Sequence, residues 1–270
     1  MVLGLVVAAF CSTGYADETF VEGFDGFSNE GGWNLGLAPG EMIEPTGGNP
    51  GYWLHTPFLD TAIVRTATTP GIGSRFTGNF RAENVVAIGL DAITKYVDFS
   101  ADERPMSVML FDDNDTPDDP TDDSWVYRVG GKNIPRPGEG WQSYSFEVPN
   151  GSKGLPGGWV AGYDFNAPPR DADAIWDSVI TGVDYVVFNW HDPDYFSIFQ
   201  LWDVGVDNMS ITRASGCYAD FTGDGALDLF DFLAFVNAFN AADNAADCDG
   251  DGSFTLFDFL CFTNAFNGGC

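Results

Sequence analysis

The chain carries little positive charge. Its 11 lysine and arginine residues face 40 aspartate and glutamate residues, for a formal net charge of −29 at pH 7. Nucleic acid or an anionic lipid surface would repel such a chain, so we expect no nucleic-acid partner and look first for a cation. The apolar run from Val2 to Phe10 is too short to span a bilayer, and we expect no membrane span.

Motifs of common hydrolases are also missing. The chain has two histidines, His55 and His191, and they form no His-x-x-x-His metal motif. No Gly-x-Ser-x-Gly nucleophile motif occurs. A carboxylate pair suited to glycoside hydrolysis is always available among so many acidic residues, so its availability is weak support for an enzyme. We favour a noncatalytic protein, with a glycoside hydrolase as the alternative.

Glycine and proline, by contrast, are abundant. The chain holds 33 Gly and 15 Pro, with β-branched and aromatic residues between them, which predicts short strands joined by turns. Six segments are expected to be strands: residues 85–90, 106–111, 125–129, 141–148, 182–188 and 201–207. This spacing, with no convincing helix between the segments, predicts a mainly β front domain, a jelly-roll β-sandwich.

The first 16 residues are expected to be a signal peptide that is cut before Asp17. Gly14 and Ala16 supply the small residues that the cleavage site needs at −3 and −1. No basic residue precedes the apolar run, and the alternatives are a buried strand or a lipoprotein modified at Cys11. We therefore expect a secreted or cell-surface protein.

The composition changes at residue 217. All lysines, arginines and tryptophans lie before it, whereas the rest holds nine Asp, no Glu and no basic residue. We expect a β-sandwich at 17–213, a linker at 214–216 and a second domain at 217–270. The four cysteines of this tail are expected to form disulfides rather than a zinc site, because no histidine lies near them.

The tail contains a repeat with a period of 27 residues. The segment that begins at Asp220 matches the one that begins at Asp247 at 14 of the first 21 positions. Each copy has the spacing of a twelve-residue calcium loop, with Gly225 or Gly252 at the turn. The predicted ligands are Asp220, Thr222, Asp224, Ala226 (carbonyl), Asp228 and Asp231 in the first loop. In the second they are Asp247, Asp249, Asp251, Ser253 (carbonyl), Thr255 (through water) and Asp258.

A helix is predicted after each loop, from Leu229 to about Phe239 and from Leu256 to about Phe266. In the first helix, one apolar stripe is expected from Leu229, Phe232, Leu233, Val236 and Phe239. No helix is predicted before either loop. A loop followed by a helix, twice, resembles the dockerin domain. The resemblance implies a small all-α calcium-binding domain with two calcium ions, folding that depends on them, and docking to a cohesin-like scaffold protein.

The tail departs from dockerins at loop positions 10 and 11. First-type dockerins commonly carry small hydroxyl residues there, whereas this chain has Leu229, Phe230, Leu256 and Phe257. These residues are expected either to form an apolar patch for another partner or to pack between the two halves. The tail is more similar to cysteine-ended dockerin-like tails of secreted bacterial proteins. That resemblance implies the disulfides Cys217–Cys270 and Cys248–Cys261, one of three possible pairings.

The front domain resembles laminin B-type and galactose-binding-like sandwiches. The resemblance lies in five short segments, at residues 24–26, 32–33, 48–52, 140–144 and 206–211. Relatives of this shape often hold a structural calcium ion where the first and last strands meet. The resemblance implies that Glu22 and Asp207 are its carboxylate ligands, the alternative being a solvated strand end.

Four aromatic residues are candidates for sugar binding, because an aromatic ring matches the apolar face of a pyranose. Trp125 and Tyr127 alternate onto one strand face, and Trp190 and Tyr195 lie in one predicted loop. We expect a secreted, noncatalytic protein whose sandwich binds an extracellular polymer, a polysaccharide (glycan), and whose tail anchors it. A self-assembling surface protein is a further alternative.

Overall fold

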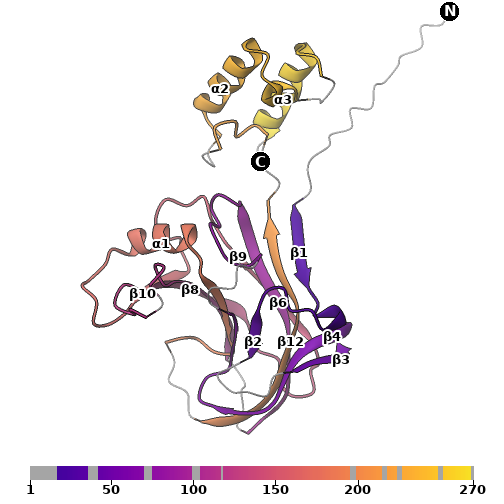
Figure 1. Ribbon diagram of the computed structural model, residues 1–270, viewed down its shortest axis with the longest axis vertical. Coiled ribbons are helices and arrows are strands. Elements are labelled where there is room, and N and C mark those ends of the chain that lie inside the picture. Colours follow the sequence, from indigo (N-terminus) through magenta and orange to yellow (C-terminus); the bar gives the residue numbers. More distant parts are fainter. Residues whose placement is uncertain are drawn as a thin grey trace, which may run out of the picture. The chain divides into compact units, whose positions relative to one another are not determined.

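The computed structural model describes residues 17–35, 42–69, 75–98, 104–116, 118–194, 199–214, 218–223, 227–248 and 252–268. The chain divides into two compact units, and the boundary falls between Arg213 and Ala214, where the composition changes. Strands dominate the larger unit and helices the smaller one (Figure 1). No helix in the described part of the chain is long and apolar enough to cross a membrane.

The larger unit consists of two antiparallel sheets. Sheet A has the order β3 (Met42–Gly48), β4 (Gly51–Thr61), β12 (Gln200–Arg213), β6 (Val85–Val97) and β9 (Gln142–Glu147), with β1 (Glu18–Glu22) also paired to β12. Sheet B has the order β10 (Trp159–Tyr163), β8 (Ser124–Asn133), β7 (Pro105–Asp112), β11 (Tyr185–Asn189), β5 (Arg65–Thr68) and β2 (Trp33–Leu35). A short 3-10 turn, η1 (Asp25–Phe27), follows β1. The prediction of a mainly β sandwich is confirmed.

All six predicted strand segments contain a strand. Five of them match β6, β7, β8, β9 and β12, and the sixth contains β11 but begins too early, because residues 182–184 precede the strand. The expectation that no helix interrupts the strands is wrong. Helix α1 (Ala172–Thr181) lies between β10 and β11, and Asp171 caps it by accepting a hydrogen bond from the Ala174 amide.

Aromatic side chains fill the space between the sheets. Trp33, Trp176, Trp190 and Trp202 are all completely buried there, and α1 contributes Trp176. Burying one large apolar side chain contributes about 1.5–3 kcal/mol to stability. The sandwich therefore has a hydrophobic core of its own.

The smaller unit contains α2 (Leu229–Asn240), the 3-10 turn η2 (Asn244–Ala246) and α3 (Leu256–Gly268). The two predicted helices are therefore confirmed. Among its described residues, the fully buried apolar ones are two pairs related by the 27-residue repeat, Ala219 with Ala246 and Phe235 with Phe262. The Phe235 and Phe262 rings stack with centroids 4.0 Å apart. Equivalent side chains of the two copies thus meet at the centre of the unit.

The predicted apolar stripe of α2 is partly wrong. Phe232, Val236 and Phe239 face the core, but Leu229 and Leu233 are exposed. Phe235 takes their place as the fully buried apolar residue of the helix. The helix carries apolar residues around most of its circumference, so spacing alone does not identify the buried side.

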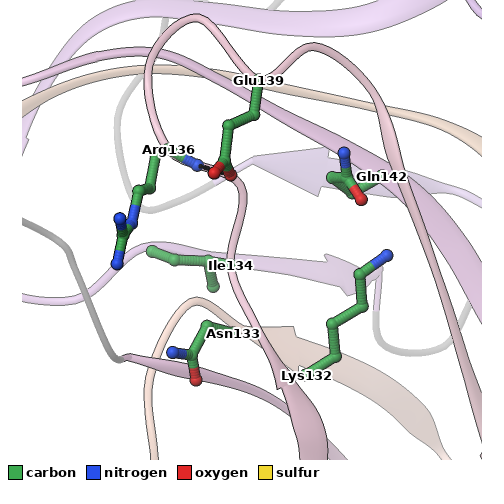
Figure 2. Close-up of a pocket in the computed structure, with 6 residues that line it drawn as sticks. All are labelled: Lys132, Asn133, Ile134, Arg136, Glu139 and Gln142. Carbon is green, nitrogen blue, oxygen red and sulfur yellow. Dashed lines mark hydrogen bonds between the residues drawn. The ribbon is translucent and has the colours of Figure 1, made fainter.

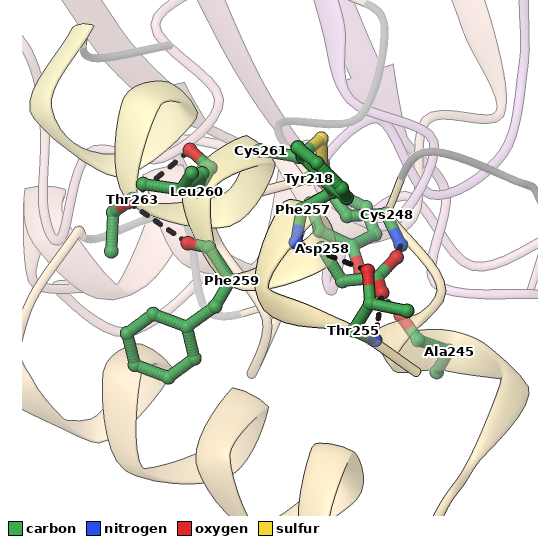
Figure 3. The surroundings of a disulfide bond; sticks show 10 residues. All are labelled: Tyr218, Ala245, Cys248, Thr255, Phe257, Asp258, Phe259, Leu260, Cys261 and Thr263. Carbon is green, nitrogen blue, oxygen red and sulfur yellow. Dashed lines mark hydrogen bonds between the residues drawn. A yellow bond between two sulfur atoms is a disulfide. The ribbon is translucent and has the colours of Figure 1, made fainter. Parts of the chain in front are cut away.

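A disulfide joins Cys248 to Cys261, as the resemblance to cysteine-ended tails implied. Figure 3 shows it beside Tyr218, whose hydroxyl donates to the Ala245 carbonyl at 2.7 Å. The bond connects the start of the second predicted calcium loop to α3. The predicted partners Cys217 and Cys270 lie outside the described residues, as do the predicted signal peptide and most of the predicted linker.

Candidate functional site

The outer face of sheet A carries the polar and aromatic groups from which we build a site. Successive side chains along a strand point to opposite faces. On β4 and β12, Leu54, Val204 and Val206 face the core. His55 and Asp203, one residue from Leu54 and Val204 respectively, therefore face outward, toward the side of sheet A that is away from sheet B.

Two carboxylates hold the imidazole of His55. Its Nδ1 lies 2.6 Å from Oε1 of Glu44 on β3, and its Nε2 lies 2.7 Å from Oδ1 of Asp203 on β12. His55 is only 5% exposed, whereas Glu44 is partly open to solvent. Both nitrogens carry protons when both carboxylates accept hydrogen bonds, so this geometry suits an imidazolium between two anions.

Trp53 extends this cluster on β4. Its indole stacks on His55 with ring centroids 4.2 Å apart and donates to the Thr46 carbonyl at 3.0 Å. The ring lies across Gly205 of β12, where an added Cβ would be 2.1 Å from the Trp53 ring. Lys95 places its ammonium 5.3 Å from the centre of the same ring. The absence of a side chain at Gly205 thus leaves room for the Trp53 ring to lie there and stack on His55.

Next to this cluster, two exposed aromatic side chains flank Asp203. Tyr96 on β6 pairs directly with Asp203. On the other side, β4 has a bulge, so that Pro57 and Phe58 together oppose Asp203. Phe58 is 65% exposed and Tyr96 44% exposed. We call Phe58, Asp203 and Tyr96 the aromatic row; its ends are about 10 Å apart across three strands.

The backbone of Phe58 is strained. Its φ is +57°, a left-handed conformation that bulky residues seldom adopt and that costs about 1–3 kcal/mol. Bulges next to binding sites often redirect a side chain. An exposed ring gains little from burial, so this strain points to a use for the ring outside the fold.

Tyr96 is held by its hydroxyl group. It donates to Oδ1 of Asp98 at 2.7 Å, and Oδ2 of Asp98 accepts a hydrogen bond from the Leu201 amide. The hydrogen bond to Asp98 raises the pKa of Tyr96 above its ordinary value, so the hydroxyl stays protonated at neutral pH. The ring is therefore oriented before any ligand arrives.

The predicted sugar-binding pair Trp125 and Tyr127 lies on the outer face of sheet B. Trp125 belongs to a ladder of parallel rings with Phe111 and Tyr185, and its indole also lies over Gly162 of β10. Rings stacked in this way turn their faces to one another. Tyr127 is buried, so the prediction that it offers its ring to a ligand is wrong. Packing of sheet B accounts for Trp125.

The prediction for Trp190 is also wrong. Trp190 is 1% exposed and belongs to the core between the sheets, so no ligand reaches its ring. The residue follows the end of β11, and its amide donates to the Val64 carbonyl. Tyr195 lies outside the described residues.

The predicted calcium ligands Glu22 and Asp207 both lie buried at the junction of β1 and β12. Each accepts backbone hydrogen bonds: Glu22 from Phe24, Glu30 and Gly31, and Asp207 from Asn49 and Asn208. Among the described residues, no three acidic, histidine or cysteine residues are grouped to hold a metal ion. A calcium ion at this junction stays a prediction.

The charge at this junction is nevertheless unusual. Burial raises the pKa of Asp207 to about 6, and the nearby carboxylates of Asp91 and Asp25 act in the same direction. Asp91 accepts hydrogen bonds from the side chains of Asn49 and Asn208. Neutral donors therefore offset part of the repulsion between the carboxylates.

In the tail, the last predicted ligand of each calcium loop is completely buried. Asp231 accepts from Thr222 and Asp228, and Asp258 accepts from Cys248 and Thr255. Burial alone would raise the pKa of Asp231, but these donors outweigh it and lower the pKa. The sequence has no lysine or arginine after Arg213, so no basic side chain of the tail balances these buried charges.

Asp247, the first predicted ligand of the second loop, has an oxygen that the described residues do not satisfy. Its Oδ2 accepts from the Gly252 amide at 2.9 Å, while no described donor reaches its buried Oδ1. A buried carboxylate oxygen without a donor is destabilising unless a cation supplies the missing interaction. The residues present thus fit Ca²⁺. Asp224, Ala226, Asp249 and Asp251 lie outside the described residues.

The predicted docking residues of the tail are exposed. Six apolar side chains are 45–70% exposed, three in each copy: Leu229, Phe230, Leu233, Leu256, Phe257 and Leu260. The alternative that the Leu-Phe pairs pack between the two halves is therefore wrong. We call these six residues the tail patch.

A separate open hollow of about 460 Å³ lies where β8 leads to β9 (Figure 2). Lys132 and Arg136 bring positive charge to it, but Lys132 donates to the Ser143 carbonyl, and Glu139 accepts from the Arg136 amide. The remaining lining residues are Asn133, Ile134 and Gln142. None of the described residues that line the hollow is aromatic, so they offer no stacking surface for a sugar.

No protein-family model matches the chain, and no curated protein does. The K2 cleaved adhesin domain of Lys-gingipain has 10% identity over 72% of this chain and 98% of its own, with a TM-score of 0.34. The L4b domain of human laminin alpha-2 has 10% identity over 69% and 85%, with a TM-score of 0.30. SGBP-B from a xyloglucan utilization locus of Bacteroides uniformis has 11% identity over 72% and 49%, with a TM-score of 0.29.

At such low identity, the function has to be argued from this chain's own residues. The sequence interpretation missed Glu44, His55, Phe58, Tyr96 and Asp203, because pairing between distant strands brings them together. One signal was available. Pro57 interrupts an apolar segment before Phe58, and proline within a strand favours an edge or a bulge.

Proposed function

We propose that this protein is a noncatalytic binding protein whose sandwich holds a polysaccharide on the outer face of sheet A. The aromatic row carries the proposal: two exposed rings stand on either side of a carboxylate, and the hydrogen bond to Asp98 orients one of them, Tyr96. Aromatic faces pack against the C–H faces of sugar rings, and Asp203 accepts hydrogen bonds from sugar hydroxyls. His55, held by Glu44 and stacked on Trp53, fixes Asp203 through its Nε2.

Removing the two rings tests this site. In affinity electrophoresis against a polysaccharide panel, Phe58→Ala combined with Tyr96→Ala is expected to weaken retention roughly 5- to 160-fold, taking about 0.5–1.5 kcal/mol for each ring. Phe165→Ala is the matched control, because Phe165 is the most exposed large apolar side chain described and lies in the loop after β10. Equal retention of the double variant and the wild type would contradict the proposal.

The same preparations separate binding from catalysis. A noncatalytic protein releases no reducing sugar from any member of the panel. Release that is lost on substituting Glu44 or Asp203 would instead establish the glycoside hydrolase alternative. Calcium-dependent oligomers without glycan retention would establish the self-assembling surface protein.

We further propose that the tail binds two calcium ions and docks through the tail patch. Buried Asp231 and Asp258 in a unit without basic residues, and the unsatisfied Oδ1 of Asp247, support the ions. Titration of the full chain is expected to show two sites in the tail and, if the Glu22–Asp207 prediction holds, a third in the sandwich. Asp247→Ala should remove one tail site and reduce the helical signal. Unchanged stoichiometry would contradict the assignment.

We expect the partner of the tail patch to have a complementary apolar surface. Because the tail resembles dockerins, the candidate is a cohesin-like scaffold protein. Immobilised cohesin modules are expected to retain the full chain in calcium but not in EDTA. Phe230→Ser with Phe257→Ser should abolish retention, while Phe165→Ser should not. Retention that the double variant leaves unchanged would show that the tail patch is not the docking surface.

We also propose that the protein is exported. Residues 1–16 have the pattern of a signal peptide, and disulfides such as Cys248–Cys261 persist in oxidising compartments. Mass analysis of the mature protein from an exporting host is expected to show an N-terminus at Asp17. An intact N-terminus inside the cell would contradict export.

A further inference from the structure

The charges around the aromatic row indicate which polysaccharide it takes. Beyond the row, the next residues across the same strands are Asp60 on β4, Leu201 on β12 and Asp98 just after β6. Asp60 and Asp98 are both exposed. The two rings therefore lie between these two carboxylates on one side and the His55 cluster on the other.

The whole outer face near the row is net negative. Glu44, Asp60, Asp98 and Asp203 contribute four carboxylates. The positive groups identified next to them are Lys95, whose ammonium lies over Trp53, and His55 in its imidazolium form. His55 lies between Glu44 and Asp203, so it balances charge inside the cluster rather than in the solvent above the row.

Resting on the proposed function, we propose that the aromatic row selects neutral polysaccharides and excludes those that carry carboxylate or sulfate groups. The hydroxyl groups of a neutral sugar donate hydrogen bonds to Asp203 and Asp60, and its C–H faces pack on Phe58 and Tyr96. An acidic sugar brings a like charge to the same place. Two like charges about 7 Å apart in water weaken binding roughly threefold. Several such pairs together give about a tenfold preference for the neutral polymer.

Pairs of polymers with one backbone and different charge test this selectivity. Hydroxyethylcellulose is compared with carboxymethylcellulose, and methyl-esterified polygalacturonic acid with its de-esterified form, by affinity electrophoresis of the full chain. The neutral member of a retained pair is expected to bind about tenfold more tightly at low salt. The difference in affinity should become smaller at 1 M salt, where the Debye length is about 3 Å.

Matched charge variants separate the local field from the net charge of −29. Asp60→Asn is expected to reduce the ratio of the affinities for the neutral and the acidic polymer roughly threefold. Asp115→Asn removes a charge of the same sign from the turn between β7 and β8 in the other sheet and should leave this affinity ratio unchanged. An equal reduction of the ratio by both variants would overturn the assignment of selectivity to the row.

The outcomes also separate this inference from the proposed function. If an acidic polymer is retained as strongly as its neutral counterpart, and Phe58→Ala abolishes both, the row binds glycan but the inference of neutrality fails. If no member of either pair or of the wider panel is retained, both the inference and the proposed function fail. Preference for the neutral member, lost with Phe58→Ala and reduced by salt, supports both.

Discussion

Removing the disulfide of the tail is expected to destabilise that unit alone. The bond joins residues that are 13 positions apart, and the closed loop contains most of the second predicted calcium loop. A cross-link over this length lowers the entropy of the unfolded chain and stabilises the fold by about 3 kcal/mol. Domains of this size are stable by only about 3–8 kcal/mol, at about 0.05–0.15 kcal/mol per residue. Cys248→Ser with Cys261→Ser therefore removes much of the tail's stability.

The position of the tryptophans allows unfolding of the two units to be measured separately. All eight tryptophans lie before residue 217, so tryptophan fluorescence reports unfolding of the sandwich. Circular dichroism at the helical band reports α2 and α3, with a smaller part from α1. In urea with saturating calcium, the helical transition of the double variant is expected at lower urea concentration, while the fluorescence transition stays in place.

The first copy of the repeat is an internal control. Phe221 and Ala234 occupy the positions that correspond to Cys248 and Cys261, so that copy has no equivalent disulfide. Reducing agent should therefore lower the urea midpoint of the wild-type helical transition at least as far as the double substitution does. A shift below about 1 kcal/mol in the helical transition would refute the argument from loop closure.

Three further changes have expected outcomes. Gly205→Ala places a methyl group against Trp53 and should destabilise the sandwich by about 1–3 kcal/mol, measured by thermal unfolding with tryptophan fluorescence; an unchanged midpoint would contradict the close approach. Burial, and then neighbouring carboxylates, raise the pKa of Asp184 to about 6. Between about pH 4 and 6 the folded state thus keeps a proton that the unfolded chain has lost, so stability should fall as pH rises through this window. Asp184→Asn should flatten that fall and Asp118→Asn should not; a fall equally steep in both would argue against Asp184. Phe58→Gly relieves the left-handed strain, so urea unfolding should show stability kept or raised by up to about 1 kcal/mol while glycan retention is lost; a clear loss of stability would show that the ring supports the fold.

The strands were predictable because each is a short apolar or alternating segment between glycine and proline residues. Helix α1 was not, because its buried residues come in adjacent pairs, Ile175 with Trp176 and Val179 with Ile180. Such pairs are equally typical of a buried strand. The capping residue Asp171 and the spacing of the two pairs were the available signals of a helix.

The tail was predictable because the same loop-and-helix pattern occurs twice in its sequence. The loop spacing predicts both helices. Exposure of Leu229 and Phe230 was one of two alternatives, and the structure shows that they are exposed. The buried side of α2 does not, because nearly every turn of that helix carries phenylalanine. The choice of Phe235 depends on its partner Phe262 in the other copy.

The aromatic row could not be predicted, because it exists only through strand pairing. Phe58 and Asp203 are far apart in the sequence, and a bulge in β4 decides that they meet. The error at Trp190 has the opposite cause. Polar loop residues beside a tryptophan predict that its ring is exposed, yet the Trp190 ring turns back into the core.

Strand β12 has a mechanical consequence if the tail is anchored and the sandwich holds a polymer. One unbroken strand carries Asp203 near its start and ends at Arg213, the last residue before the tail unit. It pairs with β4 and β6 on its two sides. Tension between anchor and polymer would pass along about 30 Å of this strand, loading its lateral hydrogen bonds in shear rather than peeling them one at a time.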